Sequence, residues 1–155
     1  MRPTLVKKLV VDPGLRLMAV PFDTVEAKFG LYAIGFQETG FDTRHQRGGP
    51  AHSYWQFERI GVEEVMVNRG SKLSAQMFCE ELDIPFDLDT VWKAIEWNSH
   101  LACVFARLAL WRHPAALPDV NNIEAWWEYY IDIWRPGKPH RDRFNLACRK
   151  ALELV

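Results

Sequence analysis

The chain has 155 residues, which is long enough to close one hydrophobic core without metal ions or disulfide bonds. Hydrophobic residues make up 48% of it and charged residues 25%, and these proportions exclude a largely disordered chain. Nineteen basic and twenty acidic residues leave a formal net charge of −1, so no overall positive charge favours a nucleic-acid partner.

The first predicted helix spans residues 24 to 38. Asp23 and Glu26 have the spacing of a capping box, and Gly40 is suited to a left-handed helix end. The apolar residues between them recur at helical intervals: Val25, Phe29, Tyr32, Ala33 and Phe36. Residues 40 to 53, which contain Gly48, Gly49 and Pro50, then predict a loop of about a dozen residues, a length that compact domains usually keep for function.

A short segment from Tyr54 to Phe57 returns to the core, and two helices are predicted at 61 to 68 and 72 to 82, with Ser71 capping the second. Asp89 is expected to cap the longest helix, at about 90 to 112. Asn122 caps another that ends before the proline-containing residues 135 to 139, and a last helix covers about 141 to 154. The sequence predicts an all-α single domain, residues 1 to 155, of about six to seven helices.

Cysteines and tryptophans are expected to be mostly structural. The three cysteines are far apart and have apolar neighbours, which predicts buried free thiols: Cys79, Cys103 and Cys148. No closely spaced pair of Cys or His indicates a metal site, so we expect no metal and no cofactor. Four tryptophans at core spacing on helices are expected to pack inside: Trp92, Trp97, Trp126 and Trp134.

The N-terminal segment, residues 1 to 14, has short apolar runs interrupted by charged residues. This pattern predicts neither a signal peptide nor a membrane span. If the substrate lies outside the cytoplasm, the protein must therefore be delivered by another route.

Glu38 is the first candidate for chemistry. It ends an apolar helix between Phe36 and Phe41, where partial burial and the negative end of the helix dipole both disfavour the carboxylate. Both effects raise the pKa of a carboxyl group, as a general acid working near neutral pH requires.

Two segments around Glu38 resemble motifs of the goose-type lysozyme and lytic transglycosylase superfamily. The first is Glu38-Thr39-Gly40-Phe41, where the family has Glu-Ser-x-Phe. The second is the run from Pro50 to Gln56, Pro-Ala-His-Ser-Tyr-Trp-Gln, where the family has Gly-Ala-x-Gly-Leu-Met-Gln. The two family glycines are replaced by Pro50 and Ser53. The resemblance implies a lysozyme-like fold, with Glu38 as the catalytic residue and Gln56 in contact with substrate.

Further substrate contacts are expected around these motifs. Trp55 and Ser53 lie inside the second motif, and Arg44 lies in a basic loop cluster with His45 and Arg47 that could meet glycan carboxylates. The family also has an Ala-Tyr-Asn-x-Gly motif whose Tyr approaches the catalytic Glu. The nearest candidates for that Tyr are Tyr130, Tyr129 and Trp126, without the Asn-x-Gly.

The mechanism implied by the resemblance needs one carboxyl group. Glu38 protonates the oxygen between N-acetylmuramic acid and N-acetylglucosamine, then acts as base for the sugar's 6-hydroxyl, giving an anhydro product, or for water. Ordinary glycosidases use a carboxylate pair, and Asp42 or Glu58 could supply the second group, although loop capping is the expected role of Asp42.

The segments GGPAHSYWQFE and WRPGKP also look like those of small lysozyme-like proteins of tailed bacteriophages. This predicts a peptidoglycan-degrading protein located in a phage particle, or in host cytoplasm before release, and acting at the bacterial cell wall in the periplasm. Its partners would be glycan strands and other phage particle proteins. The alternatives are a catalytically silent structural component of the particle and a hydrolase of another glycan on the same fold.

Overall fold

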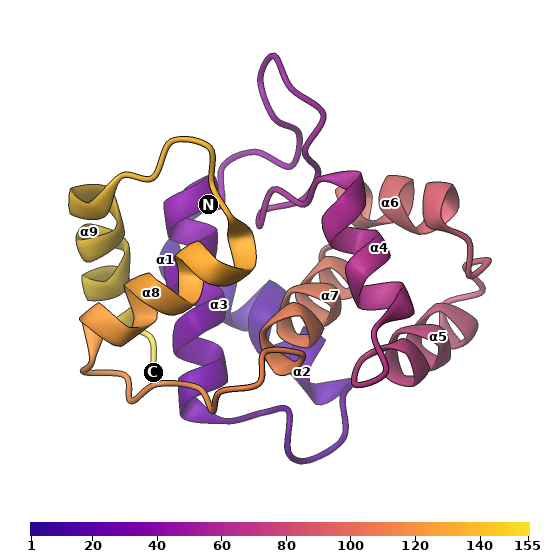
Figure 1. The fold of residues 1–155 in the computed structure, drawn as a ribbon, viewed down its shortest axis with the longest axis horizontal. Helices are drawn as coiled ribbons and strands as arrows, with labels where there is room; N and C mark the ends of the chain where they lie inside the picture. The colour runs from indigo at the N-terminus through magenta and orange to yellow at the C-terminus, as the bar shows by residue number, and fades with distance from the viewer.

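The computed structural model describes all of residues 1–155 and is built from helices joined by loops (Figure 1). A helical N-terminal segment consists of α1 (Pro3–Val6), the π-helical turn η1 (Lys7–Val11) and α2 (Asp12–Arg16). Seven longer helices follow: α3 (Val25–Glu38), α4 (Arg59–Val67), α5 (Lys72–Glu81), α6 (Leu88–Trp97), α7 (Ser99–Trp111), α8 (Ile123–Trp134) and α9 (Arg141–Leu152). The predicted all-α class is confirmed. None of these helices combines the length and the apolar character needed to cross a membrane.

Helix α7 lies at the centre of the fold. It contacts η1 and each of the helices α2 to α6. Helix α3, however, packs mainly along α9. Every residue of α7 from Leu101 to Leu110 is buried, as expected for a helix surrounded by others. Figure 1 shows α3, α8 and α9 on one side of α7 and α4, α5 and α6 on the other, with the loop after α3 projecting from the top of the molecule.

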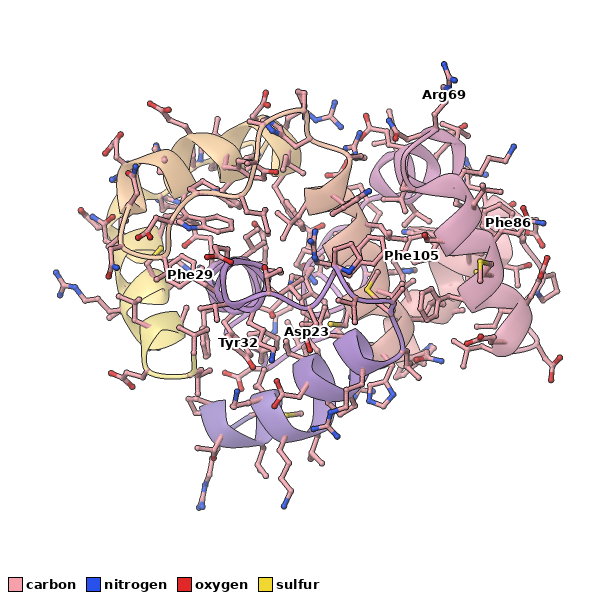
Figure 2. All side chains as sticks on the ribbon, turned by 90° about the horizontal axis from the view of Figure 1, so that it is seen from below. Asp23, Phe29, Tyr32, Arg69, Phe86 and Phe105 are labelled. Atoms are coloured by element: carbon pink, nitrogen blue, oxygen red, sulfur yellow. The ribbon has the colours of Figure 1, made fainter.

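Helix α3 carries much of the core. Thr24, rather than the predicted Asp23, caps it by accepting a hydrogen bond from the Ala27 amide, while Asp23 pairs with Lys28 at 3.0 Å. Phe29 and Tyr32 are fully buried and point from α3 into the surrounding elements (Figure 2). The N-terminal segment, for which no helix was predicted, packs its buried valines and Leu15 into the same core.

The prediction of one long helix from 90 to 112 is wrong, because the segment forms two helices, α6 and α7. Asn98 leaves the helical conformation, with φ −95° and ψ 94°, and its side chain caps α7 by accepting from the Leu101 amide. Asp87 caps α6, whereas the predicted cap, Asp89, binds Arg59. Apolar spacing continues through a break of one residue, so periodicity alone cannot locate it.

Two other local predictions are corrected. Ser71 precedes α5 but does not cap it; its fully buried hydroxyl donates to the Val65 carbonyl at 2.7 Å. Trp97 is 72% exposed rather than packed, while Trp126 is fully buried as expected. All three cysteines are buried free thiols, which confirms their predicted state.

Candidate active site

An open groove of about 880 Å³ runs between the end of α3, the loop before α4, the end of α8 and the start of α9. Charged and polar side chains line most of it. Its lining includes Glu38, Gln56, Glu58, Tyr130, Trp134 and Arg143. The groove thus brings together residues that are up to 106 positions apart in the chain, from Gln37 to Arg143.

Glu38 lies in the wall of this groove with its side chain only partly exposed. The Tyr130 hydroxyl donates a hydrogen bond of 2.7 Å to Glu38 Oε1. Burial raises the pKa of Glu38, and the Tyr130 hydrogen bond and the positive charge of Arg143 oppose that rise. Since the carboxyl group has two oxygens and one protein donor, Oε2 is free to meet a ligand.

The end of α3 is tied directly to the second motif. The Thr39 hydroxyl donates to the Tyr54 carbonyl at 2.8 Å and accepts from the Phe41 amide at 3.1 Å. Gly40 and Phe41 then take left-handed conformations, with φ of +64° and +59°. The chain therefore turns sharply after Glu38 and stays against the loop that carries Gln56.

Gly35 allows this turn to pack closely. A Cβ atom built on Gly35 would lie 2.1 Å from Cζ of Phe41, so the aromatic ring occupies the space that any side chain would need. Phe41 also packs edge-on against Phe36 and Trp55. The aromatic cluster holds the helix end, and with it Glu38, against the loop.

Trp55 and Ser53 were predicted to bind substrate, and this prediction is wrong for both. Trp55 is fully buried and its indole N–H donates to the Leu31 carbonyl in α3 at 2.9 Å. Ser53 is 1% exposed and its hydroxyl accepts from the Trp55 amide. Neither residue lines the groove. They fix the loop to α3 instead, because the buried indole N–H needs an acceptor and finds it there.

Of the remaining loop residues predicted to bind substrate, some line the groove and one does not. Gln56 lines the groove, with its amide N–H₂ donating to the Ser53 carbonyl at 2.8 Å. Arg44 does not line the groove; its guanidinium lies over the Tyr54 ring and donates to the Tyr54 hydroxyl, and its contact with substrate stays a prediction. Arg47, from the same basic cluster, does line the groove.

Among the three aromatic candidates for the partner of Glu38, the structure places Tyr130 at the carboxyl group. Burial and the nearby Glu38 strongly raise the pKa of Tyr130, so its hydroxyl stays a donor. The Tyr129 hydroxyl donates to the Leu110 carbonyl, and Trp126 is fully buried against Phe29.

No second carboxylate matches Glu38 in environment. Asp42 is exposed, binds the N-terminal amine and lies outside the groove. Glu58 lines the groove but is exposed to solvent. Glu64 lines it too, but Arg112 and Arg135 bind its two oxygens at 2.6 and 2.7 Å. Glu38 is therefore the one groove carboxyl group that combines burial with a neutral hydrogen-bond donor.

Several groove residues were missed as site candidates, among them Trp134, Lys138 and Arg143. The residues after α8 were interpreted as a helix stop and as part of the phage resemblance, but not as a source of site residues. Residues 138 to 143 nevertheless contain Lys138, His140, Arg141 and Arg143. A basic run directly after a proline and glycine turn was the available signal. Trp134 was predicted to pack inside, but it is only partly buried and donates its indole N–H to the Trp55 carbonyl.

No model of a known protein family, no curated protein and no solved structure matches the chain. The chemistry of the groove therefore follows from its own side chains. They offer one carboxyl group that resists ionisation, a phenol that holds it, and cations along the rim.

Proposed function

We propose that the protein cleaves the bond between N-acetylmuramic acid and N-acetylglucosamine in peptidoglycan, with Glu38 as the single general acid and base. The observation that carries this proposal is the Tyr130–Glu38 hydrogen bond of 2.7 Å inside an open groove, at a carboxyl group whose pKa burial raises. A general acid must hold its proton near neutral pH, and this environment favours the protonated form.

In the proposed reaction, a glycan strand lies in the groove with its scissile oxygen next to Glu38. Tyr130 holds Oε1, so the proton on Oε2 is free to pass to the glycosidic oxygen as that bond breaks. The resulting carboxylate then removes a proton from the 6-hydroxyl of the same sugar, which closes an anhydro ring, or from an attacking water. Both outcomes return Glu38 to its acid form.

Other groove residues suit a wall polymer. Arg47, Lys138 and Arg143 can meet the lactyl and peptide carboxylates that peptidoglycan carries. Trp134 offers part of an indole face to a sugar ring.

We further propose that the protein acts at the bacterial cell wall as a component of a bacteriophage particle. This rests on the resemblance of its sequence to small phage lysozyme-like proteins. A catalytically silent structural role is the competing function, and an activity assay separates the two.

The test is the clearing of a peptidoglycan suspension by purified protein. Glu38→Gln should reduce clearing by about 10²- to 10⁴-fold, because the amide cannot supply the proton. Asp42→Asn is the matched control: Asp42 lies four positions along the chain, outside the groove, and the variant should clear as the wild type does.

Mass spectrometry of the released fragments distinguishes anhydro from hydrolysed products. Undiminished clearing by Glu38→Gln would overturn the role of Glu38. The silent structural role would be the correct function if the wild-type protein clears none of several wall types and binds tightly to other particle proteins.

A further inference from the structure

Two histidines face each other across the loop before α4. The segments around them form isolated antiparallel bridges, in which the Ser53 amide donates to the Arg44 carbonyl and the Gln46 amide donates to the Ala51 carbonyl. These two bonds flank His45 and His52, which makes them a directly opposed, non-hydrogen-bonded pair with side chains on one face. Their ring centroids lie 5.4 Å apart.

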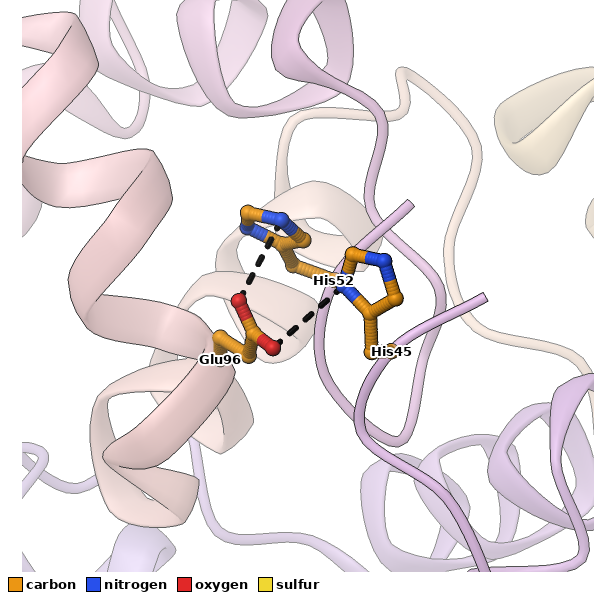
Figure 3. Close-up of side chains that lie close together, drawn as sticks. All are labelled: His45, His52 and Glu96. Carbon is orange, nitrogen blue, oxygen red and sulfur yellow. Dashed lines mark ion pairs between the residues drawn. The ribbon is translucent and has the colours of Figure 1, made fainter. Parts of the chain in front are cut away.

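Glu96 of α6 completes the cluster. His45 Nδ1 lies 3.3 Å from Glu96 Oε1, and His52 Nε2 lies 3.3 Å from Glu96 Oε2 (Figure 3). The His52 side chain is 7% exposed and that of Glu96 15%, while that of His45 is 56% exposed. One ligand atom from each of the three residues lies within 4.8 Å of the other two.

The other nitrogen of His52 is already used. Nδ1 lies 2.9 Å from the Trp92 carbonyl, which can only accept, so Nδ1 carries a hydrogen and donates it. In the neutral ring, Nε2 then presents a lone pair toward a carboxylate oxygen. Two acceptors at 3.3 Å need a positive charge between them: a proton or a metal ion. The ring is also held by stacking on Trp92, with centroids 4.1 Å apart and planes 10° apart.

We propose that His45, His52 and Glu96 bind one Zn²⁺ ion. Two His and one carboxylate, with water in a fourth position, are an established ligand set for zinc. With bonds of about 2.0 to 2.1 Å, the ligand atoms of a tetrahedral site lie about 3.3 to 3.4 Å apart. Each histidine already lies at that distance from one oxygen of Glu96, His45 from Oε1 and His52 from Oε2. The exposed His45 ring can turn toward the oxygen that the ion binds. A backbone carbonyl bound to the far nitrogen of His52 is the outer contact typical of a zinc-ligating histidine.

The ion would fasten the loop to α6. The same loop carries Gln46, Arg47 and Gln56 in the wall of the groove, whereas the three ligands lie outside the groove. Zinc bound to these ligands would therefore hold the loop that forms part of the groove wall, from a position outside the groove. It would take no part in the reaction in the groove. The sequence pattern does not indicate this site, because the histidines are seven residues apart and Glu96 lies 44 residues further on.

The first experiment uses the full chain, stripped with a chelator, and titrates it with zinc alone by calorimetry. We expect one Zn²⁺ per chain, a higher melting temperature with zinc, and slower amide hydrogen exchange in residues 43 to 57. Mg²⁺ and Ca²⁺ should not compete, because both prefer oxygen ligands. Failure of the wild type to bind zinc would overturn the proposal and leave a proton as the bridge.

Variants locate the ion. His45→Ala and Glu96→Gln should each weaken zinc binding by about 100-fold, the upper end of the effect of disturbing even an outer contact. His45 is exposed, so its truncation leaves the core intact and the variant folded. His100→Ala and Glu80→Gln are matched controls outside the cluster and should bind as the wild type does. Unchanged affinity in both ligand variants would assign the zinc to another site and refute this one. Either result is independent of peptidoglycan cleavage.

Discussion

The environment of Glu38 predicts a pH-dependent gain in stability when this residue is replaced by Gln. Its carboxyl group is partly buried and has a single protein donor, so the native state raises its pKa above the ordinary value of 4.5. Below that value, both the folded and the unfolded chain keep the proton, so the carboxyl group does not lower the free energy of unfolding. As the pH rises through 4.5 the unfolded chain ionises freely while the folded chain resists, so wild-type stability falls until the native pKa is passed.

Glu38→Gln removes this effect and keeps an amide oxygen that can accept from Tyr130. Each unit by which the native pKa exceeds 4.5 is worth about 1.36 kcal/mol at high pH. For a chain of this length that is roughly 3–5 °C in melting temperature. The difference in melting temperature, variant minus wild type, should therefore rise as the pH increases above 4.5 and level off once the native pKa is passed. Thermal unfolding in a series of buffers will show this.

Asp87→Asn supplies a control of opposite sign. Hydrogen bonds from Thr90 at the start of α6 lower the pKa of Asp87, so its stabilising effect is present above 3.8 and is lost as the pH falls through the native value. Its difference in melting temperature, variant minus wild type, should fall as the pH rises toward 3.8 and stay flat above. A flat curve for Glu38→Gln, or one that falls as the pH rises, would refute the account of Glu38 given above.

Two further substitutions test the neighbours of Glu38. Tyr130→Phe removes a hydrogen bond that favours the carboxylate, so the alkaline limb of the pH–rate profile should move to higher pH; an unmoved limb would mean that Tyr130 does not act on Glu38. Gly35→Ala forces a methyl group against Phe41 and should cost about 1–3 kcal/mol, less about 0.5–1 kcal/mol from the better helix propensity of Ala. Gly61→Ala, with its nearest contact at 3.2 Å, should unfold at or above the wild-type temperature, and equal melting temperatures for the two variants would contradict the close packing at Gly35.

Local features of the sequence identified most helices and several of their ends. Asn122 caps α8 as predicted, and the left-handed Gly40 follows α3. These signals succeed because a cap or a turn depends on residues within one helical turn of each other. The break at Asn98 and the N-terminal helical segment were missed, since neither interrupts or creates a long apolar period.

The candidate site likewise has features that the local sequence predicts and features that it does not. The position of Glu38 at the end of an apolar helix could be recognised in the sequence, because the helix, the glycine and the flanking aromatics are all local. Which aromatic hydroxyl reaches it could not be recognised, because Tyr129 and Tyr130 are adjacent in the chain and their hydroxyls find different partners only once α8 packs. Trp55 was predicted to contact substrate because it lies within a motif. Only the tertiary structure shows that its indole packs against α3 instead.

The sequence by itself therefore determined the all-α class, the ends of most helices and the acid to examine first. These depend on residues close together in the chain. Only the tertiary structure decided that Tyr130 holds Glu38, that Arg143 lies near it, and that Glu96 meets His45 and His52. Each of these arrangements joins residues 44 to 105 positions apart, and the packing of whole helices, which no local pattern specifies, sets the distance between them.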